Sequence, residues 1–254
     1  MPDKTMTTNP QSPFLILTLR RTGGTSLMTF MSAVSTFPTQ SHEPFNPDRP
    51  WGKIVARYEE TKNVKFLRSD IEAVLSPRPN IKHCFEIIPT IVTRELIEIC
   101  FKLGYKFFLL TRSNEADRLL SLALATATGA WGPETAQKIY PRILTGEVKV
   151  PPLSVQDSVK RARLDASSLG DTLKLLRHRN IPYEWLVFEE IYQGKISTEE
   201  QAIRIVSTLG VQTLSNDPRL ASFRESSGQN SRSIQPYIGN IEAVRFALKN
   251  ICIP

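Results

Sequence analysis

The feature that most constrains the fold is a glycine-rich turn between an apolar run and an amphipathic segment, in residues 14–27, FLILTLRRTGGTSL. The run Phe14–Leu19 is almost wholly apolar and follows a proline, which predicts a buried strand. The segment Ser26–Thr36 is apolar at helical spacing, which predicts a helix. Because Gly23 and Gly24 allow a tight turn between them, we expect a strand, a turn and a helix in direct succession.

The same alternation of strands and helices continues along the chain. Apolar runs predict further strands at 81–88, 105–110 and 183–188, and helical periodicity predicts helices at 91–103, 114–128, about 159–176 and 199–209. Strands that alternate with helices are typical of α/β folds. We therefore expect a central, mainly parallel sheet flanked by helices, with ligands at the carboxyl ends of the strands.

The length of the chain fits one domain. A single α/β unit commonly reaches 254 residues, so we expect one domain over 1–254 with a flexible leader at 1–12. Segments 38–80 and 131–153 interrupt the alternation, and we interpret them as insertions that shape a site. Three of their aromatic residues are either stacking surfaces for a ligand or packing residues: Trp51, Trp131 and Tyr140.

The charge of the chain predicts an anionic ligand. There are 32 Lys and Arg against 25 Asp and Glu, a net charge of +7, which suits a nucleic acid, a membrane surface or a phosphorylated small molecule. The three cysteines show no C-x-x-C pairing, so we expect neither a disulfide framework nor a zinc site. Apolar runs are short and the N-terminus is polar, so we expect a cytoplasmic protein without a transmembrane segment.

The glycine-rich turn has the composition of an anion-binding loop. Backbone N–H groups at the start of a helix have no partner within the helix and attract anions. With the charge of Arg21, we expect them to bind a phosphate or a sulfate through Thr22, Gly23, Gly24, Thr25 and Ser26. The alternative is a tight turn with two solvated arginines.

The turn differs from the loop of phosphoryl-transfer enzymes. A Walker A loop, G-x-x-x-x-G-K-[ST], has a Lys that this turn lacks. Arg112 follows the strand at 105–110, at a place where such enzymes have an Asp that binds magnesium. We therefore expect arginines rather than a metal ion to neutralise the anion.

Taken in order, the motifs resemble those of the PAPS-dependent sulfotransferases, which transfer a sulfuryl group from 3′-phosphoadenosine 5′-phosphosulfate (PAPS). FLILTLRRTGGTSL is similar to the family's 5′-phosphosulfate loop, and FFLLTRSNEADRLLSL is similar to its 3′-phosphate motif. Three further segments resemble the family in the same order: HEPFNP (42–47), IPYEWLVFEEI (181–191) and QNSRSIQPYIGNIEAV (229–244). The chain departs from the pattern at Phe188 and Glu190, where Tyr and Asp are usual, and lacks a clear Lys-Gln pair at 225–229.

The resemblance implies a P-loop-like three-layer fold, PAPS as the donor and no required metal. It implies that Arg21 stabilises the leaving 5′-phosphate, that Arg112 and Ser121 bind the 3′-phosphate, and that Gln229 and Arg232 lie near the nucleotide. The implied acceptor is a hydroxyl of a carbohydrate, of another small molecule or of a lipid-linked headgroup. Segments 38–80 and 131–153 would surround that acceptor.

The acceptor hydroxyl needs a base, for which there are three candidates. Glu43 is our choice because the acidic segment of the family falls there. His42 is the second candidate, since an unperturbed imidazole has a pKa near 6.5. His83 is the third, and its place in an apolar strand favours a structural role.

Two other classes of function stay open. A P-loop kinase or NTPase is disfavoured by the missing Lys and carboxylate. A nucleic-acid-binding module is suggested only by the net charge, and because the basic residues are dispersed we expect no nucleic-acid partner. A sulfotransferase fold without activity is a third alternative, because a fold does not guarantee a function.

Overall fold

The central sheet is parallel, as the alternation of elements predicts. The computed structural model describes residues 11–40, 43–193, 198–213, 217–220, 223 and 230–251. Within these residues five strands lie in the order β2 (Thr39–Gln40), β3 (Asn80–Cys84), β1 (Phe14–Thr18), β4 (Lys106–Thr111) and β5 (Tyr183–Val187), and each neighbouring pair is parallel. The glycine-rich turn therefore leaves the middle strand, between β3 and β4.

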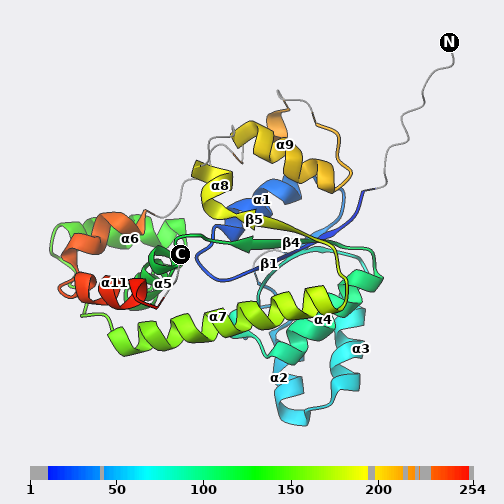
Figure 1. The fold of residues 1–254 in the computed structure, drawn as a ribbon, viewed down its shortest axis with the longest axis horizontal. Coiled ribbons are helices and arrows are strands. Elements are labelled where there is room, and N and C mark those ends of the chain that lie inside the picture. The colour runs from blue at the N-terminus through cyan, green and yellow to red at the C-terminus, as the bar shows by residue number, and fades with distance from the viewer. Residues whose placement is uncertain are drawn as a thin grey trace.

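Helices cover both faces of the sheet, so the expected P-loop-like three-layer α/β fold is confirmed. One face carries α1 (Gly24–Val34), α8 (Phe188–Gln193) and α9 (Thr198–Thr208), and the other carries α4 (Thr90–Lys102) and α7 (Val155–His178) (Figure 1). The strands supply the two cores by alternation, since Leu15 and Leu17 face α4 and α7 whereas Phe14 and Ile16 face α1 and α9. The helices α2 (Gly52–Thr61) and α3 (Val64–Leu75) pack outside α4.

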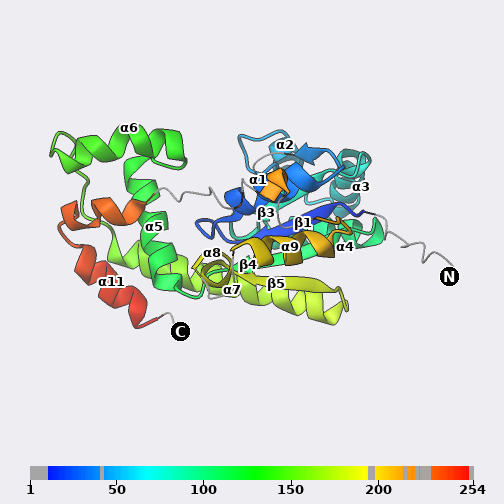
Figure 2. The same ribbon diagram turned by 90° about the horizontal axis from the view of Figure 1, so that it is seen from above.

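A helical lobe stands at the carboxyl edge of the sheet. It contains α5 (Glu115–Thr128), which follows β4, together with α6 (Pro133–Leu144), the 3₁₀ segment η3 (Ser231–Tyr237) and α11 (Ile241–Lys249). Figures 1 and 2 both show these helices at one end of the molecule, beyond the strands. They share an apolar core of their own, which includes Leu120, Tyr140 and Ile234. The lobe therefore borders the loops that leave the carboxyl ends of the strands.

Two expectations about elements are wrong. The strand expected at 81–88 ends at Cys84, because the chain turns into a 3₁₀ segment, η1 (Phe85–Ile87), at the sheet edge. The inserted segment at 131–153, where the sequence predicts no helix, contains α6, whose Ala136, Tyr140 and Ile143 have helical spacing. Its prolines concealed the helix, although Pro133 lies in the first turn, where proline is tolerated. No described helix is long and apolar enough to cross a bilayer.

Candidate anion-binding site

The loop between β1 and α1 is wound so that the start of the helix is open. Arg21 and Gly23 have left-handed backbone angles, with φ of 68° and 83°. Gly23 caps α1 without any side-chain hydrogen bond, and the first helical bond runs from the Leu27 amide to its carbonyl at 3.2 Å. The Thr22 hydroxyl donates to the Leu19 carbonyl and closes the turn. The N–H groups of the first turn are thus directed at the position that an anion would take.

A buried lysine lies beneath this loop. Lys82 pairs with Ile16 across the β1–β3 ladder and is only 3% exposed. Its Nζ donates to Thr25 Oγ1 at 2.8 Å and lies 2.7 Å from Glu43 Oε1. Its stem passes so close to the loop that a Cβ on Gly24 would lie 3.1 Å from Lys82 Cδ. The loop therefore has a lysine after all, supplied by the neighbouring strand.

Sequence reasoning missed Lys82, although a signal for it was present. A lysine in the middle of an apolar run that predicts a strand buried on both faces is unusual, since lysine is almost never fully buried without a partner. The partners are Glu43 and Thr25, which are 39 and 57 positions away along the chain. A local sequence pattern does not predict contacts between residues so far apart along the chain.

Glu43, the first candidate for the base, is held by Lys82. Burial on its own would raise the pKa of Glu43, but the charge and hydrogen bond of Lys82, together with a hydrogen bond from Cys84, lower this pKa overall. The Cys84 thiol donates to Glu43 Oε1 at 3.5 Å, and burial raises the pKa of this thiol. In the free protein Glu43 is therefore an ion-paired carboxylate and a weak base.

Arg21 extends from the loop towards the helical lobe. Its Nε donates to Ser121 Oγ of α5 at 3.0 Å, and Ser231 Oγ donates to the same oxygen at 3.1 Å. Burial lowers the pKa of Arg21, and the nearby charge of Arg112 acts in the same direction. The structure thus brings the predicted residues Arg21 and Ser121 together and adds Ser231, which was not predicted.

Arg112 lies at the end of β4, beside the same loop. Its Nε donates to Glu189 Oε1 at 3.2 Å, its Nη1 lies 3.4 Å from the Arg21 carbonyl oxygen, and its guanidinium covers the ring of Phe188 at 4.7 Å. Glu189 also accepts hydrogen bonds from the amides of Ser113 at 2.8 Å and Asn114 at 3.4 Å. Burial would raise the pKa of Glu189, but these backbone hydrogen bonds lower it overall. A protein carboxylate therefore fixes the Nε edge of Arg112.

A buried network of charges supports the loop from the α7 side. Arg20 donates from its amide and from Nε to Glu86 Oε1, both at 2.9 Å. Arg118, which is fully buried, donates to the Arg20 carbonyl at 2.9 Å and pairs with Asp165 of α7. Arg161 also pairs with Asp165 and donates to the Glu86 carbonyl at 3.0 Å. Arg20, directly before the loop, and the segment η1 are thereby tied to α7.

The remaining candidate residues have other surroundings. His42 and Gln229 lie outside the described residues. Arg232 is exposed and pairs with Asp117 of α5. His83 is 1% exposed, its Nε2 lies 2.9 Å from Thr93 Oγ1, and burial lowers its pKa to about 4. His83 faces the α4 side of the sheet, with Phe45 against its ring, which fits a structural role.

The three aromatic residues considered as stacking surfaces, Trp51, Trp131 and Tyr140, differ in their exposure and their neighbours. Trp51 is 8% exposed and packs against Phe45 with ring centres 5.1 Å apart, so it is a packing residue. Trp131 is 47% exposed, and the Arg20 guanidinium lies over its ring at 5.7 Å. Tyr140 is buried in the lobe, near Arg21. Of the three, Trp131 and Tyr140 border the anion-binding loop.

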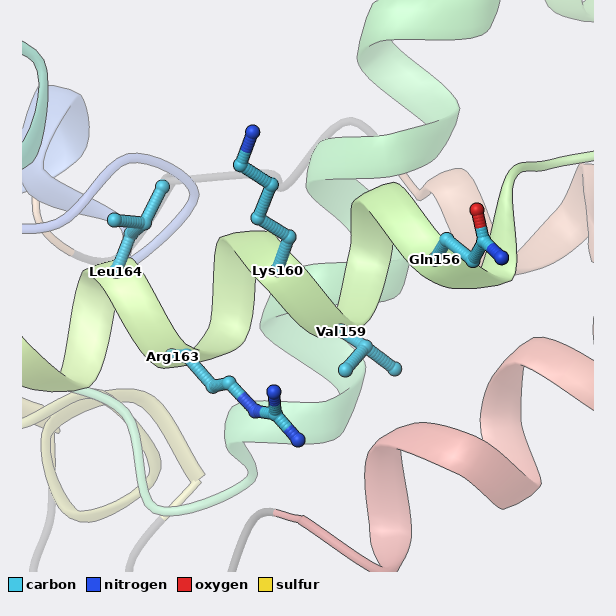
Figure 3. A pocket seen from close by; sticks show the side chains of 5 residues that line it. All are labelled: Gln156, Val159, Lys160, Arg163 and Leu164. Atoms are coloured by element: carbon cyan, nitrogen blue, oxygen red, sulfur yellow. The ribbon is translucent and has the colours of Figure 1, made fainter.

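An open hollow of about 400 Å³ lies along α7, away from the predicted residues. Figure 3 shows its five lining side chains on successive turns of the helix: Gln156, Val159, Lys160, Arg163 and Leu164. Lys160 and Leu164 point to one side of the helix, and Val159 and Arg163 point to the other. No residue of the loop lines this hollow, and we do not assign it to the site.

Comparison with known proteins gives one distant structural match. No family model matches the chain, and no curated protein matches it significantly. The sulfotransferase domain from the Synechococcus PCC 7002 olefin synthase matches over 99% of this chain and 98% of that domain, with 10% identical residues and a TM-score of 0.42. At this identity the match says nothing about individual residues of the site.

Proposed function

We propose that the protein is a sulfotransferase that transfers a sulfuryl group from PAPS to a hydroxyl of a carbohydrate or of another small-molecule or lipid-linked acceptor. The observation that carries the proposal is the position of two cations at one glycine loop. Arg21 lies within the turn, and Lys82 lies beneath the first turn of α1. Fixed cations and helix amides stabilise the negative charge that develops on a leaving phosphate.

The two glycines allow the loop backbone to lie directly against the side chains of Phe188 and Lys82. A Cβ on Gly23 would lie 2.7 Å from the Phe188 ring, and one on Gly24 would touch Lys82 and Thr18. Neither position therefore tolerates a side chain between the loop and the groups around it. When it is bound, PAPS would supply the sulfuryl group and a 3′,5′-bisphosphate leaving group, and the loop would hold the 5′ end.

The surroundings of Lys82 support binding without a metal. In P-loop enzymes that transfer phosphoryl groups, a loop hydroxyl and a carboxylate hold Mg²⁺. Here the Thr25 hydroxyl and the Glu43 carboxylate both contact the Lys82 ammonium, at 2.8 Å and 2.7 Å. An ammonium between these two groups takes the electrostatic role that a metal has in those enzymes.

Glu43 is the proposed base, and Lys82 links its basicity to the donor. In the free protein the ion pair with Lys82 lowers the pKa of Glu43. A donor phosphate at the loop competes with Glu43 for the Lys82 ammonium. As that ion pair weakens, the pKa of the buried carboxylate rises towards the value that suits proton abstraction from a hydroxyl. Glu43 would thus become an effective base only when a donor is present.

We assign the 3′-phosphate to Arg112. Glu189 holds the Nε edge of this guanidinium, and the terminal Nη1 lies 3.4 Å from the Arg21 carbonyl at the loop. Arg can bind a phosphate through two hydrogen bonds, and in this proposal the terminal nitrogens of Arg112 supply them. Ser121 contacts Arg21 instead, so we propose that it orients Arg21 beside the 5′-phosphosulfate.

One observation also favours a second candidate, a kinase or NTPase. Lys82 brings a lysine ammonium to the loop, which removes one of the two arguments against that class. The other argument stands, since Arg112 rather than an acid follows β4. The two functions differ in their dependence on magnesium.

Isothermal titration with 3′-phosphoadenosine 5′-phosphate (PAP) separates the two candidates. We expect PAP to bind equally well in EDTA and in magnesium, and far more tightly than AMP, because Arg112 binds the 3′-phosphate. Adding ATP under the same conditions is the control. ATP binding that requires magnesium, with no preference for PAP over AMP, would contradict the sulfotransferase and support the kinase.

A further inference from the structure

A buried phenol beside the anion-binding loop has no hydrogen-bond partner among the described residues. The side chain of Tyr140 is on α6, is 6% exposed and packs in the apolar core of the lobe. Its hydroxyl oxygen is inaccessible to solvent, yet no described group donates to it or accepts from it. Buried hydroxyls nearly always have a partner, because an unpaired one costs about as much as a lost hydrogen bond.

The position of this hydroxyl connects it with Arg21. Arg21 Nε donates to Ser121, and Ser231 of η3 donates to the same serine oxygen. The segment η3 packs against α6, and Tyr140 belongs to the same apolar core as Leu120 and Ile234, which adjoin this chain of hydrogen bonds. Burial raises the pKa of Tyr140, while the nearby charge of Arg21 opposes that rise. The phenol therefore lies near Arg21 and stays protonated at neutral pH.

Packing does not require the oxygen of Tyr140. A phenylalanine at this position would fill the same space in the apolar core and would leave no polar atom unpaired. The presence of a tyrosine here is explained if its hydroxyl gains a hydrogen-bond partner when a ligand binds. The charge that lowers its pKa belongs to Arg21, which is proposed to bind the anion.

We propose that Tyr140 Oη donates a hydrogen bond to the anionic group that Arg21 binds at the glycine loop. This inference rests on the proposed function in one respect: for a sulfotransferase, the group is the 5′-phosphosulfate of the donor. Tyr140 and Arg21 would then bind one group from two elements, the lobe helix α6 and the β1–α1 loop. The lobe thereby becomes part of the donor site.

The variant Tyr140→Phe tests the inference because it removes only the unpaired oxygen. A structural role predicts unchanged or increased thermal stability and unchanged ligand binding. The proposed role also predicts unchanged or increased thermal stability, but about tenfold weaker binding of PAPS in isothermal titration, since a hydrogen bond to a charged group is lost. Equal affinity of the wild type and Tyr140→Phe for PAPS would overturn the inference.

Tyr105→Phe is the control at a buried tyrosine outside the site. Tyr105 is 5% exposed, directly precedes β4 at the end opposite Arg112, and its hydroxyl donates to the Pro79 carbonyl at 3.0 Å. We expect Tyr105→Phe to bind PAPS like the wild type, although the lost hydrogen bond lowers its stability. A loss of the same size in both variants would point to a general change in packing and would also overturn the inference.

Titration with inorganic sulfate separates this inference from the proposed function. If the wild type binds sulfate but neither PAPS nor PAP, the proposed donor is wrong, and a weaker affinity of Tyr140→Phe for sulfate still supports the role of Tyr140. Equal sulfate affinity of the two proteins would overturn it. If the wild type binds none of the three ligands, both the proposed function and the inference fail.

Discussion

At the scale of single residues, the ion pair between Lys82 and Glu43 affects both donor binding and the basicity of Glu43. Lys82 is 3% exposed, and a buried ammonium needs a partner, which Glu43 provides at 2.7 Å. The same pair keeps Glu43 a weak base. Removing the charge of Glu43 should therefore have opposite effects on binding and on chemistry.

We predict that Glu43→Gln binds PAP as tightly as the wild type or more tightly, and that its sulfuryl transfer falls by at least about a hundredfold. Binding is kept because Lys82 loses its competitor for the phosphate, and transfer is lost because the amide does not accept the proton. Titration with PAP and a transfer assay measure the two effects. The control is Glu190→Gln, an exposed side chain. Full transfer by Glu43→Gln would exclude Glu43 as the base.

At this scale the sequence predicts residues whose neighbours lie in the same motif. The residues from Arg21 to Ser26 share one turn, so their place at the start of α1 could be read directly. Lys82 and Ser231 could not, since their partners Glu43 and Ser121 are 39 and 110 positions away. Arg112 and Glu189 are also far apart along the chain, at 77 positions, and their pairing depends on the contact of β4 with β5.

At the scale of elements, the turn between β1 and α1 is held by an aromatic wall. Phe188 begins α8, lies against Gly23 and carries the Arg112 guanidinium on its ring. The rings of Phe188 and Tyr192 lie 5.0 Å apart, and Tyr192 lies 5.3 Å from Phe223. The departure from the family's usual Tyr at 188 therefore keeps a ring at this place. A substitution in the turn that displaces the Phe188 ring should therefore also displace the Arg112 guanidinium.

We predict that Gly23→Ala destabilises the protein more than Gly129→Ala does. Both glycines have positive φ, 83° and 71°, so both variants incur the cost of a left-handed alanine, about 1–2 kcal/mol. A Cβ on Gly129 meets nothing within 4 Å, whereas one on Gly23 lies 2.7 Å from the Phe188 ring. We expect about 1–3 kcal/mol of further loss for Gly23→Ala from this overlap. Denaturant unfolding of both variants measures the difference, and equal losses would contradict the close contact with Phe188.

The elements that sequence reasoning missed are those with weak local signals. Helix α6 is not predicted because two prolines, Pro133 and Pro141, fall within twelve residues. The strands of the parallel sheet were easier, since a strand buried on both faces is a nearly continuous apolar run. The end of β3 was placed too late because the apolar run continues beyond Cys84 into η1.

At the scale of the whole molecule, the separate parts of the site meet at the carboxyl ends of the central strands. The central strand supplies the loop, β3 supplies Lys82, β4 supplies Arg112, and the lobe supplies Ser121. The buried pairs of Asp165 with Arg118 and Arg161 tie α5 and α7 to the chain around the loop. Because the strands are parallel, the sequence predicts that their carboxyl ends lie at the same end of the sheet. It does not predict which side chains there contact one another.

The cations at these strand ends account for part of the net charge of +7. Arg21, Lys82 and Arg112 lie around one loop, and the acids nearest to two of them, Glu43 and Glu189, each face a single cation. Such a cluster attracts a small polyanion into the site. The site therefore requires that the three cations act on one donor.

Conversion of PAPS to PAP in the presence of EDTA tests that requirement most directly. The wild type, Arg21→Ala and Lys82→Met are each incubated with PAPS and a mixture of hydroxyl-bearing small molecules, and the nucleotides are separated by chromatography. We predict that the wild type forms PAP together with a product heavier by one SO₃ group, and that both variants form neither above the protein-free control. Intact PAPS with the wild type, or equal PAP formation by Arg21→Ala, would contradict it.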